Sequence, residues 1–179
     1  EKTPWEEWLK YGGVRILDLE ESARVQKVFH RSRLLPSRFV YRDKNASLRT
    51  PQKRLPVNAK ARLCVGGQNC PDSAAGKLRT DAPTVQRTSL SAMLQIGFNL
   101  GWLSALVIGD ISAAFLQGQS REGDPMYFEQ AKSRCLPGMV AGQLIQIVKG
   151  VFGLRDAPRA WWMELSTYLH SFGFTPHSL

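Results

Sequence analysis

The sequence predicts an α+β fold with mixed helices and antiparallel strands. Stretches with helical spacing of apolar residues and stretches with strand alternation both occur, but without a regular strand–helix alternation. No internal repeat of fixed period is present, which argues against a solenoid or a propeller. At 179 residues, with 43% hydrophobic and 22% charged residues, the chain is long enough to bury the core of one domain.

Basic residues outnumber acidic ones. Lys and Arg number 24 against 15 Asp and Glu, which gives a net charge of +9 and a pI near 9.8. Such a charge favours a polyanionic partner, either nucleic acid or an anionic membrane surface. No apolar run approaches the roughly 20 residues that span a bilayer, and the first residues lack the order of a signal peptide. We therefore expect an intracellular protein that does not insert into a membrane.

The cysteines predict neither a disulfide framework nor a zinc site. Cys64, Cys70 and Cys135 are odd in number and lack a second Cys or His pair at zinc-ligand spacing. We therefore expect no disulfide partner. The three histidines are scattered, and none lies beside a Ser or Cys in a nucleophile motif, which argues against a hydrolase triad.

Two helices are predicted near the start of the chain. The first is capped by Thr3, has Pro4 at its first helical position and stops at Gly12-Gly13, with Trp5, Trp8 and Leu9 on one face. The second starts near Asp18, where two glutamates suit the positive end of a helix.

A hairpin with a long connection is predicted from Ser37 onward. Residues 39–41 favour a strand, residues 42–58 form a polar and basic stretch with two prolines, and a second strand follows up to Val65. In the second strand Lys60 and Arg62 alternate with apolar residues, so a period of two places both cations on one face. Two aligned cations can bind phosphates.

The middle of the chain is expected to contain a loop, a helix and an apolar strand. Residues 66–83 are rich in loop formers, and Thr88 is expected to cap a helix that ends near Gly101. Residues 102–110 then predict an apolar strand that carries an acid, Asp110, at its end. A lone carboxylate in such surroundings is costly unless a partner compensates its charge.

A strand pair and a helix complete the predicted elements. Residues 126–128 and 143–148 have strand character, with a turn at Pro137-Gly138 between them. The final helix is expected to be capped by Asp156, with Pro158 in its first turn and its large apolar side chains on one face.

Four residues could serve phosphoryl transfer if the partner is a nucleic acid. Mg²⁺ prefers carboxylate oxygens and phosphates, and Asp110 could supply one such oxygen ligand. Lys60 and Arg62 could face a triphosphate, and Phe115 could lie beneath a sugar. Each residue also has a plain structural explanation. Asp110 could be an acid at a strand end or a helix cap, Lys60 and Arg62 could form a solvated strand face, and Phe115 could be a core aromatic. The residues alone leave both interpretations open.

Four blocks of sequence, taken in their order along the chain, carry a resemblance to a known family. They are Ser37-Arg-Phe-Val-Tyr-Arg-Asp-Lys44, Lys60-Ala-Arg-Leu63, Gly109-Asp-Ile-Ser-Ala-Ala-Phe-Leu-Gln-Gly118 and Lys149-Gly-Val-Phe-Gly-Leu-Arg-Asp-Ala-Pro-Arg-Ala-Trp161. From about Leu35 to Phe174 the chain thereby resembles the reverse transcriptase of copia-type retrotransposons. The resemblance implies a partial right-hand polymerase fold, with fingers and part of the palm in residues 35–179, after an N-terminal helical extension in residues 1–34.

The resemblance also implies roles for individual residues. Asp110 would be the catalytic, metal-binding acid, and the backbone carbonyl of Ile111 would be a second ligand of Mg²⁺ or Mn²⁺. Arg62 and then Lys60 would bind the triphosphate of the incoming nucleotide. Phe115 would lie against its sugar and would favour deoxynucleotides over ribonucleotides.

The resemblance also implies which residues lie under the template and the nucleotide, and which partners the protein binds. By the resemblance, Phe152, Gly153, Ala157 and Pro158 would shape the surface under the template and the nucleotide. The implied partners are an RNA or DNA template-primer and deoxynucleotides.

The sequence also departs from the family pattern. Asp156 stands where Gln is usual, Asp81 where an aromatic is common, and Phe39 where a tryptophan is often found. The aromatic-x-Asp-Asp turn that supplies the other carboxylates is expected downstream of Phe174 and does not occur in the sequence. Because one carboxylate cannot clamp two ions, we expect negligible polymerase activity from these 179 residues alone.

Three hypotheses about function remain at this stage. The first is a fragment of an RNA-directed DNA polymerase whose full-length parent performs two-metal nucleotidyl transfer. The alternative is a non-catalytic, basic nucleic-acid-binding module from a decayed element, whose binding would fall steeply with added salt. The third is a structural or interaction domain that uses its tryptophan-rich helices as a partner surface.

Overall fold

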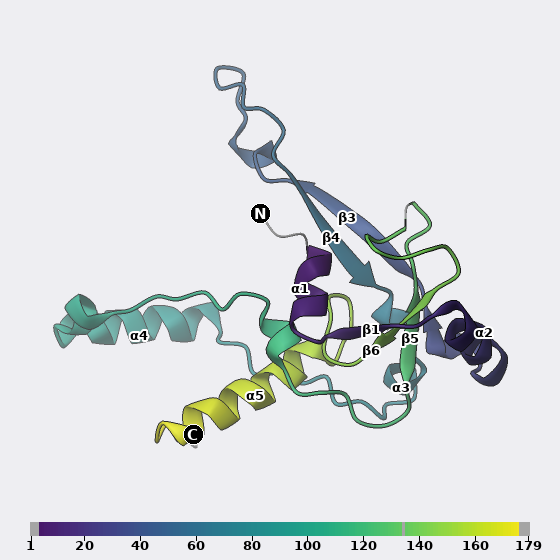
Figure 1. Ribbon diagram of the computed structural model, residues 1–179. Coiled ribbons are helices and arrows are strands. Elements are labelled where there is room, and N and C mark those ends of the chain that lie inside the picture. Colours follow the sequence, from purple (N-terminus) through teal and green to yellow (C-terminus); the bar gives the residue numbers. More distant parts are fainter. Residues whose placement is uncertain (1–3, 134, 176–179) are drawn as a thin grey trace.

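The fold mixes helices with two sheets, as the sequence predicts. The computed structural model describes residues 4–133 and 135–175 (Figure 1). In chain order the helices and strands are α1 (Pro4–Lys10), β1 (Val14–Ile16), α2 (Leu19–Val28), β2 (Leu34–Leu35), β3 (Ser37–Asp43), β4 (Ala59–Val65), α3 (Pro71–Ala74), α4 (Arg87–Asn99), β5 (Met126–Glu129), β6 (Leu144–Ile147) and α5 (Ala157–Ser171).

A four-stranded sheet forms the centre of the molecule. Its strand order is β1-β6-β5-β2, with β6 antiparallel to both β1 and β5, and β2 parallel to β5. The strand pair predicted from residues 126–128 and 143–148 is therefore confirmed. Phe128 and Ile145 face each other in the β5–β6 register, and both are fully buried.

Helix α1 packs onto this sheet through its tryptophans. Trp5 and Trp8 are buried, and the Trp8 ring lies edge-on to Phe128 with 5.9 Å between ring centroids. The prediction for Leu9 was wrong, because this side chain is exposed. Thr3, the expected cap, lies outside the described residues.

Helix α2 begins directly after Asp18, which confirms the predicted start of the second helix. The Asp18 carboxylate accepts the backbone N–H of Glu21 at 2.7 Å, and the Glu21 carboxylate accepts the backbone N–H of Asp18 at 3.3 Å. This reciprocal pair satisfies two N–H groups that the first helical turn leaves without partners.

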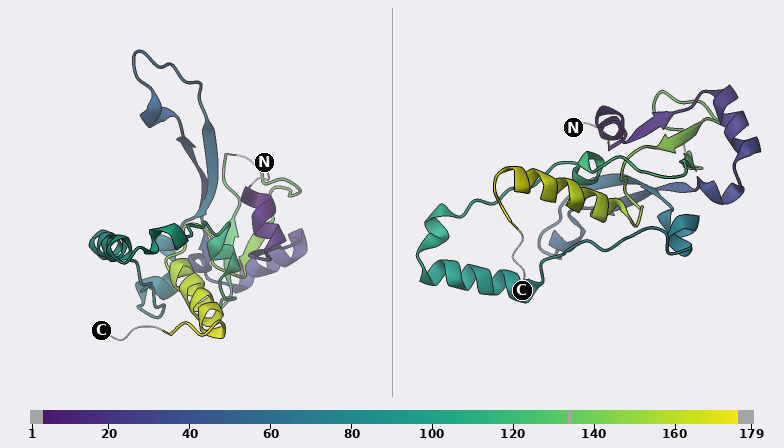
Figure 2. Two further views of the ribbon diagram at one scale, coloured as in Figure 1. Left: turned by 90° about the vertical axis from the view of Figure 1, so that its left-hand side faces the viewer. Right: turned by 90° about the horizontal axis from the view of Figure 1, so that it is seen from below.

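The predicted hairpin is confirmed and stands out from the body of the molecule (Figures 1 and 2). Strands β3 and β4 pair antiparallel along their full length, from Ser37 opposite Val65 to Asp43 opposite Ala59. At the far end the Asp43 carboxylate accepts the backbone N–H groups of Asn45 at 3.0 Å and Asn58 at 2.9 Å. The hydrogen bond from Asn58 lowers the pKa of Asp43, so this carboxylate ties the two ends of the long connection together at neutral pH.

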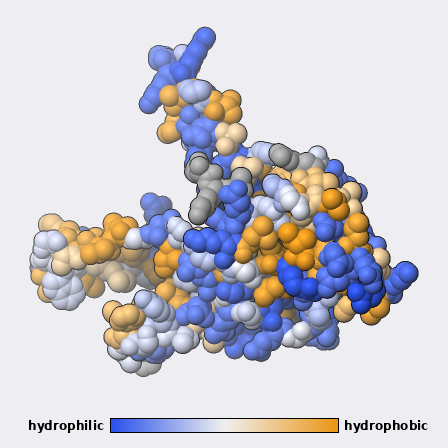
Figure 3. Space-filling model, viewed as in Figure 1, coloured by the Kyte–Doolittle hydropathy of each residue, from blue (hydrophilic) through white to orange (hydrophobic). Residues whose placement is uncertain are grey.

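Helix α4 forms an arm that lies apart from the central sheet (Figures 1 and 2). It begins at Arg87 with Gln86 at the capping position, so Thr88 is not its cap. Most of its large apolar side chains are exposed, and they make the arm hydrophobic in Figure 3. Beyond it Gly101 adopts a left-handed conformation with φ of 72°, which reverses the chain.

The apolar strand predicted for residues 102–110 does not form. Trp102–Ala105 is a short 3₁₀ helix, and the following residues are extended without a neighbouring strand. Val107 and Ile108 are 89% and 88% exposed. The physical reason is that a strand is stabilised by its ladder partners, and none of the strands in residues 4–133 and 135–175 lies beside this segment.

In residues 4–133 and 135–175, no helix is both long and apolar enough to cross a bilayer.

Candidate functional site

One pocket collects most of the residues that the sequence singles out. It has a volume of about 420 Å³ and lies where α1, β4, the segment around Asp110 and the residue Phe152 meet. Its lining residues are Pro4, Glu7, Lys60, Arg62, Asp110, Ile111, Ser112, Ala113, Ala114, Phe115 and Phe152. Residues that are far apart in the sequence therefore share one cavity.

The cationic wall of the pocket comes from β4. Lys60 and Arg62 lie on the same face of the strand and both are exposed, whereas Leu63 and Val65 are buried at its base. The guanidinium of Arg62 lies over the ring of Phe152, at 5.9 Å from its centroid. Such a cation–π contact orients the side chain and leaves its N–H groups available to an anion.

The hairpin register adds a like-charge pair to this face. Lys60 lies directly opposite Arg42 of β3, and neither side chain has an ion-pair partner in the part of the chain that the structure describes. Like charges opposite each other destabilise a sheet. An anion bound beside them would relieve that repulsion.

The aromatic floor comes from Phe115 and Phe152. Their rings meet edge to face with 5.6 Å between centroids. Phe115 belongs to a 3₁₀ helix (Ala114–Gln117) that is anchored by the buried Leu116. This short helix follows Ala113, whose φ of 54° is the only left-handed value of a non-glycine residue in the described ranges. Strain of this kind is concentrated at functional sites.

Close packing holds the short helix against α5. Gly118 follows the helix, and a Cβ at this position would lie 2.9 Å from the backbone nitrogen of Trp161 and 3.0 Å from the carbonyl carbon of Ala160. Only glycine permits this approach of two backbones. The close packing of Gly118 against α5 therefore explains why the third block ends in a glycine.

Asp110 lines the pocket and is exposed. Within the described ranges its carboxylate forms no hydrogen bond or ion pair. A second acid, Glu7 of α1, also lines the pocket. Sequence reasoning missed Glu7, because the matched blocks begin after it and no local pattern places α1 beside β4.

The carboxylates present do not fit a two-metal centre by themselves. Asp110 and the backbone carbonyl of Ile111 are oxygen donors of the kind that Mg²⁺ prefers. However, no three His, Cys, Asp or Glu side chains gather as a metal-binding group in residues 4–133 and 135–175. A clamp on both the attacking and leaving oxygens needs more acids than this.

The four residues expected to form a floor are separated in the structure. Phe152 lines the pocket, whereas Gly153 lines a different cavity beside β3. Ala157 is 1% exposed and packs beneath Gly150, so it supports the floor from behind. Pro158 is half-buried in the first turn of α5 and does not line the pocket.

Both acidic departures from the family pattern have arginine partners. Asp156 makes no capping hydrogen bond to α5; instead its carboxylate pairs with Arg121. These two side chains are only 17% and 10% exposed. Asp81 accepts hydrogen bonds from Arg79 at 2.8 Å and Arg159 at 2.7 Å, and the bond from Arg79 lowers the pKa of Asp81. Each acid therefore belongs to a local ion pair in this chain.

Replacement of Asp156 by the usual residue of the family is expected to destabilise this chain. Asp156→Gln leaves the mostly buried Arg121 guanidinium without its counter-charge, which should lower the free energy of unfolding by about 2 kcal/mol. Urea unfolding followed by circular dichroism measures the change.

Asp81→Asn is the matched control for this prediction. The Asp81 carboxylate is 61% exposed, so its ion pairs are screened by water, and a loss below about 1 kcal/mol is expected. The double variant Arg121→Leu with Asp156→Gln should recover part of the stability. Equal losses for Asp156→Gln and Asp81→Asn would contradict the assigned role of the Arg121–Asp156 pair.

Comparisons with known proteins agree with the family that the sequence resembles. The family described as reverse transcriptase (RNA-dependent DNA polymerase) matches residues 21–179. The retrovirus-related Pol polyproteins from transposons RE2 and RE1 of Arabidopsis thaliana are 33% and 31% identical to the chain over 119 residues. Each alignment covers 64% of this chain, but only 8% of the RE2 polyprotein and 7% of the RE1 polyprotein. No solved structure gives a significant match.

Proposed function

Because the chain belongs to the reverse transcriptase family, we propose that it is part of the RNA-directed DNA polymerase of a copia-type Pol polyprotein and that its pocket binds the incoming deoxynucleotide. The observation that carries the proposal is the convergence of Lys60, Arg62, Asp110 and Phe115 on one cavity. These residues come from two separate sequence blocks, and a structural explanation of each residue alone does not require them to meet.

The cations are suited to a triphosphate. Arg62 presents a planar fork of N–H donors that matches phosphate oxygens, and its contact with Phe152 reduces the entropy that binding would cost. Lys60 lies two residues away on the same face and adds a second charge. The repulsion between Lys60 and Arg42 favours binding of an anion over an empty site.

The aromatic floor is suited to a sugar. The ring of Phe115 is held in place by its contact with the ring of Phe152 and by the packing of its short 3₁₀ helix against α5. A bulky ring held in this way would clash with a ribose 2′-hydroxyl, so the pocket would prefer deoxynucleotides.

The remaining carboxylates are assigned to a further segment of the longer Pol polyprotein. Residues 106–111 have no strand partner in the described part of the chain, and the apolar side chains of Val107 and Ile108 are almost fully exposed. A strand that paired with them would bury Val107 or Ile108 and would bring its own side chains to Asp110. The family's aromatic-x-Asp-Asp turn has the acids that such a strand would need to carry.

Nucleotide binding tests the proposal directly. Calorimetric titration of the 179-residue chain with dTTP should give saturable binding, and Arg62→Ala should weaken it about tenfold because a charge-assisted, bidentate contact is lost. Arg24→Ala is the control, since Arg24 is an exposed arginine of α2 that lies outside the pocket.

Three outcomes separate the hypotheses. A loss of affinity confined to Arg62→Ala supports the nucleotide site. Binding of oligonucleotides without binding of dTTP would favour the non-catalytic nucleic-acid-binding module. An equal loss in Arg62→Ala and Arg24→Ala would contradict a specific site and would leave only general attraction between charges.

A further inference from the structure

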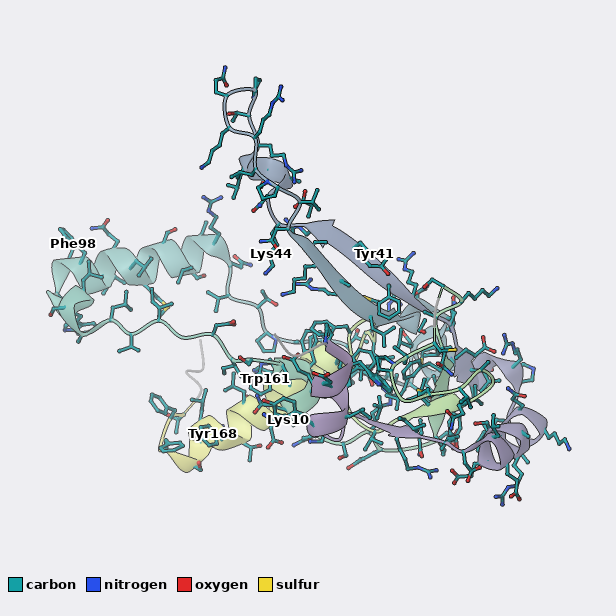
Figure 4. The ribbon with its side chains drawn as sticks, turned by 45° about the horizontal axis from the view of Figure 1, so that its top comes forward. Lys10, Tyr41, Lys44, Phe98, Trp161 and Tyr168 are labelled. Carbon is teal, nitrogen blue, oxygen red and sulfur yellow. The ribbon has the colours of Figure 1, made fainter. Side chains whose placement is uncertain are left out.

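Helix α1 forms a wall of the nucleotide pocket that the family match does not cover. The reverse transcriptase family matches the chain only from residue 21, and α1 ends before that point. Nevertheless Pro4 and Glu7 line the pocket together with Lys60 and Arg62. Figure 4 shows α1, whose last residue is Lys10, beside the hairpin that carries these two cations.

Contacts with the core fix the position of this helix. The indole N–H of Trp5 donates a hydrogen bond of 3.1 Å to the carbonyl of Pro137. In the turn after the helix, the carbonyl of Gly13 accepts the backbone N–H of Val148 at 2.9 Å, just beyond the end of β6. Because both ends of α1 are attached to the body of the molecule, Glu7 is held at the pocket by the core.

Glu7 is an unpaired acid in a pocket that also contains unpaired cations. It is half-buried, and its carboxylate forms no ion pair or hydrogen bond in residues 4–133 and 135–175. Lys60 and Arg62 likewise have no acidic partner within these ranges. The chain therefore places one negative and two positive side chains in a single cavity without joining them in a salt bridge.

Charges in such a cavity interact even without direct contact. Unlike charges several ångströms apart attract each other where water is partly excluded. The carboxylate of Glu7 therefore offsets part of the repulsion between Lys60 and Arg42, which lie opposite each other in the hairpin. Phosphate oxygens require the same cations and carry the same sign of charge as Glu7. A bound phosphate group would therefore gain from the cations and be repelled by Glu7.

We infer that Glu7 determines the ligand specificity of the pocket by competing with phosphate for Lys60 and Arg62. Repulsion of this kind is a general means of specificity, because it weakens ligands that offer only one type of contact. Phosphate contacts alone would bind weakly, and the contact of the sugar with Phe115 would decide which ligand is retained. The inference rests on the proposed function for the identity of the ligand, but the competition itself requires only a phosphate group.

A series of ligands with decreasing negative charge tests the competition. Calorimetric titrations of the 179-residue chain with dTTP, dTMP and thymidine are carried out with EDTA, which removes divalent cations that would neutralise the phosphates. Glu7→Gln should strengthen the binding of dTTP about fivefold, the effect expected for a charge several ångströms away at a protein surface. The gain should be smaller for dTMP and absent for uncharged thymidine. Glu7→Asp, which keeps the charge, should not strengthen binding.

Glu6→Gln is the matched control. It removes the same charge from the neighbouring position of α1, where the side chain is exposed and does not line the pocket. It should leave all three affinities unchanged. Raising NaCl to about 0.5 M should reduce the gain of Glu7→Gln by half or more, because the screening length falls from about 10 Å at 0.1 M to about 3 Å at 1 M salt.

Three results would overturn the inference. An equal gain for dTTP and thymidine would mean that Glu7→Gln changes the shape of the pocket. An equal gain in Glu6→Gln would reflect only the net charge of the chain. Weaker binding of dTTP by Glu7→Gln would mean that the carboxylate accepts a hydrogen bond from the nucleotide.

Inorganic tripolyphosphate separates this inference from the proposed function. If Glu7→Gln strengthens the binding of tripolyphosphate, but dTTP binds no more tightly than tripolyphosphate, the competition stands and the nucleotide pocket does not. If Arg62→Ala weakens the binding of dTTP while Glu7→Gln leaves it unchanged, the nucleotide pocket stands and the inference is wrong.

Discussion

Gly153→Ala is expected to lower the free energy of unfolding by about 4 kcal/mol or more. Gly153 has a φ of +102°, and a Cβ at this position would lie 2.0 Å from the carbonyl oxygen and 2.9 Å from the backbone nitrogen of Val65. That nitrogen donates a hydrogen bond of 2.8 Å to the carbonyl of Phe152. A methyl group here would force apart the base of the hairpin and the floor of the pocket, and urea unfolding measures the cost.

Gly123→Ala is the control for this variant. Gly123 also has a positive φ, of +89°, but a Cβ there would meet no atom within 4 Å. Its cost should be limited to backbone strain, about 1–2 kcal/mol. If Gly153→Ala costs no more than Gly123→Ala, the contact between Gly153 and Val65 does not hold the hairpin in place.

Local sequence patterns predicted those elements whose stabilising contacts are themselves local. The start of α2 follows from Asp18 and Glu21, which are three residues apart and cap each other. Side chains of a strand point alternately to its two faces. Because Leu63 and Val65 form the buried face of β4, Lys60 and Arg62 lie on the opposite, exposed face. The capping motif is formed by neighbouring residues, and the alternation depends only on which face of the strand is buried.

Elements that depend on distant partners were predicted less well. Residues 102–110 have the composition of a buried strand. The composition of a segment does not show whether another strand lies beside it to form the hydrogen-bonded ladder. Asp156 has the position of a helix cap, but Arg121 lies close enough to take its carboxylate as an ion-pair partner. A single sequence contains no signal that links Arg121 to Asp156.

The candidate site shows the same division. Spacing and resemblance selected Lys60, Arg62, Asp110 and Phe115, and the fold brings all four to one pocket. The approach of Glu7 was not predictable, because α1 reaches the pocket through the packing of its tryptophans on the central sheet. Gly153 and Ala157 were assigned to the floor, but their proximity to Phe152 in the sequence does not place them on its surface.

Removal of the Asp110 carboxylate is expected to have the largest effect on activity. The 179-residue chain should extend a primer only at background level, because the described residues do not complete a two-metal clamp. In a longer Pol polyprotein that includes an aromatic-x-Asp-Asp turn, Asp110→Asn should lower the rate of primer extension about a hundredfold or more. Asp124→Asn is the control, since Asp124 is an acid with a 75% exposed side chain outside the pocket.

The most direct measurement is therefore primer extension on an RNA template by the longer protein and by its Asp110→Asn and Asp124→Asn variants. Activity of the longer protein and of Asp124→Asn, with loss of activity in Asp110→Asn, is the predicted result. It would identify the pocket of Lys60, Arg62, Asp110 and Phe115 as the polymerase site. Full primer extension by the Asp110→Asn variant would contradict this assignment.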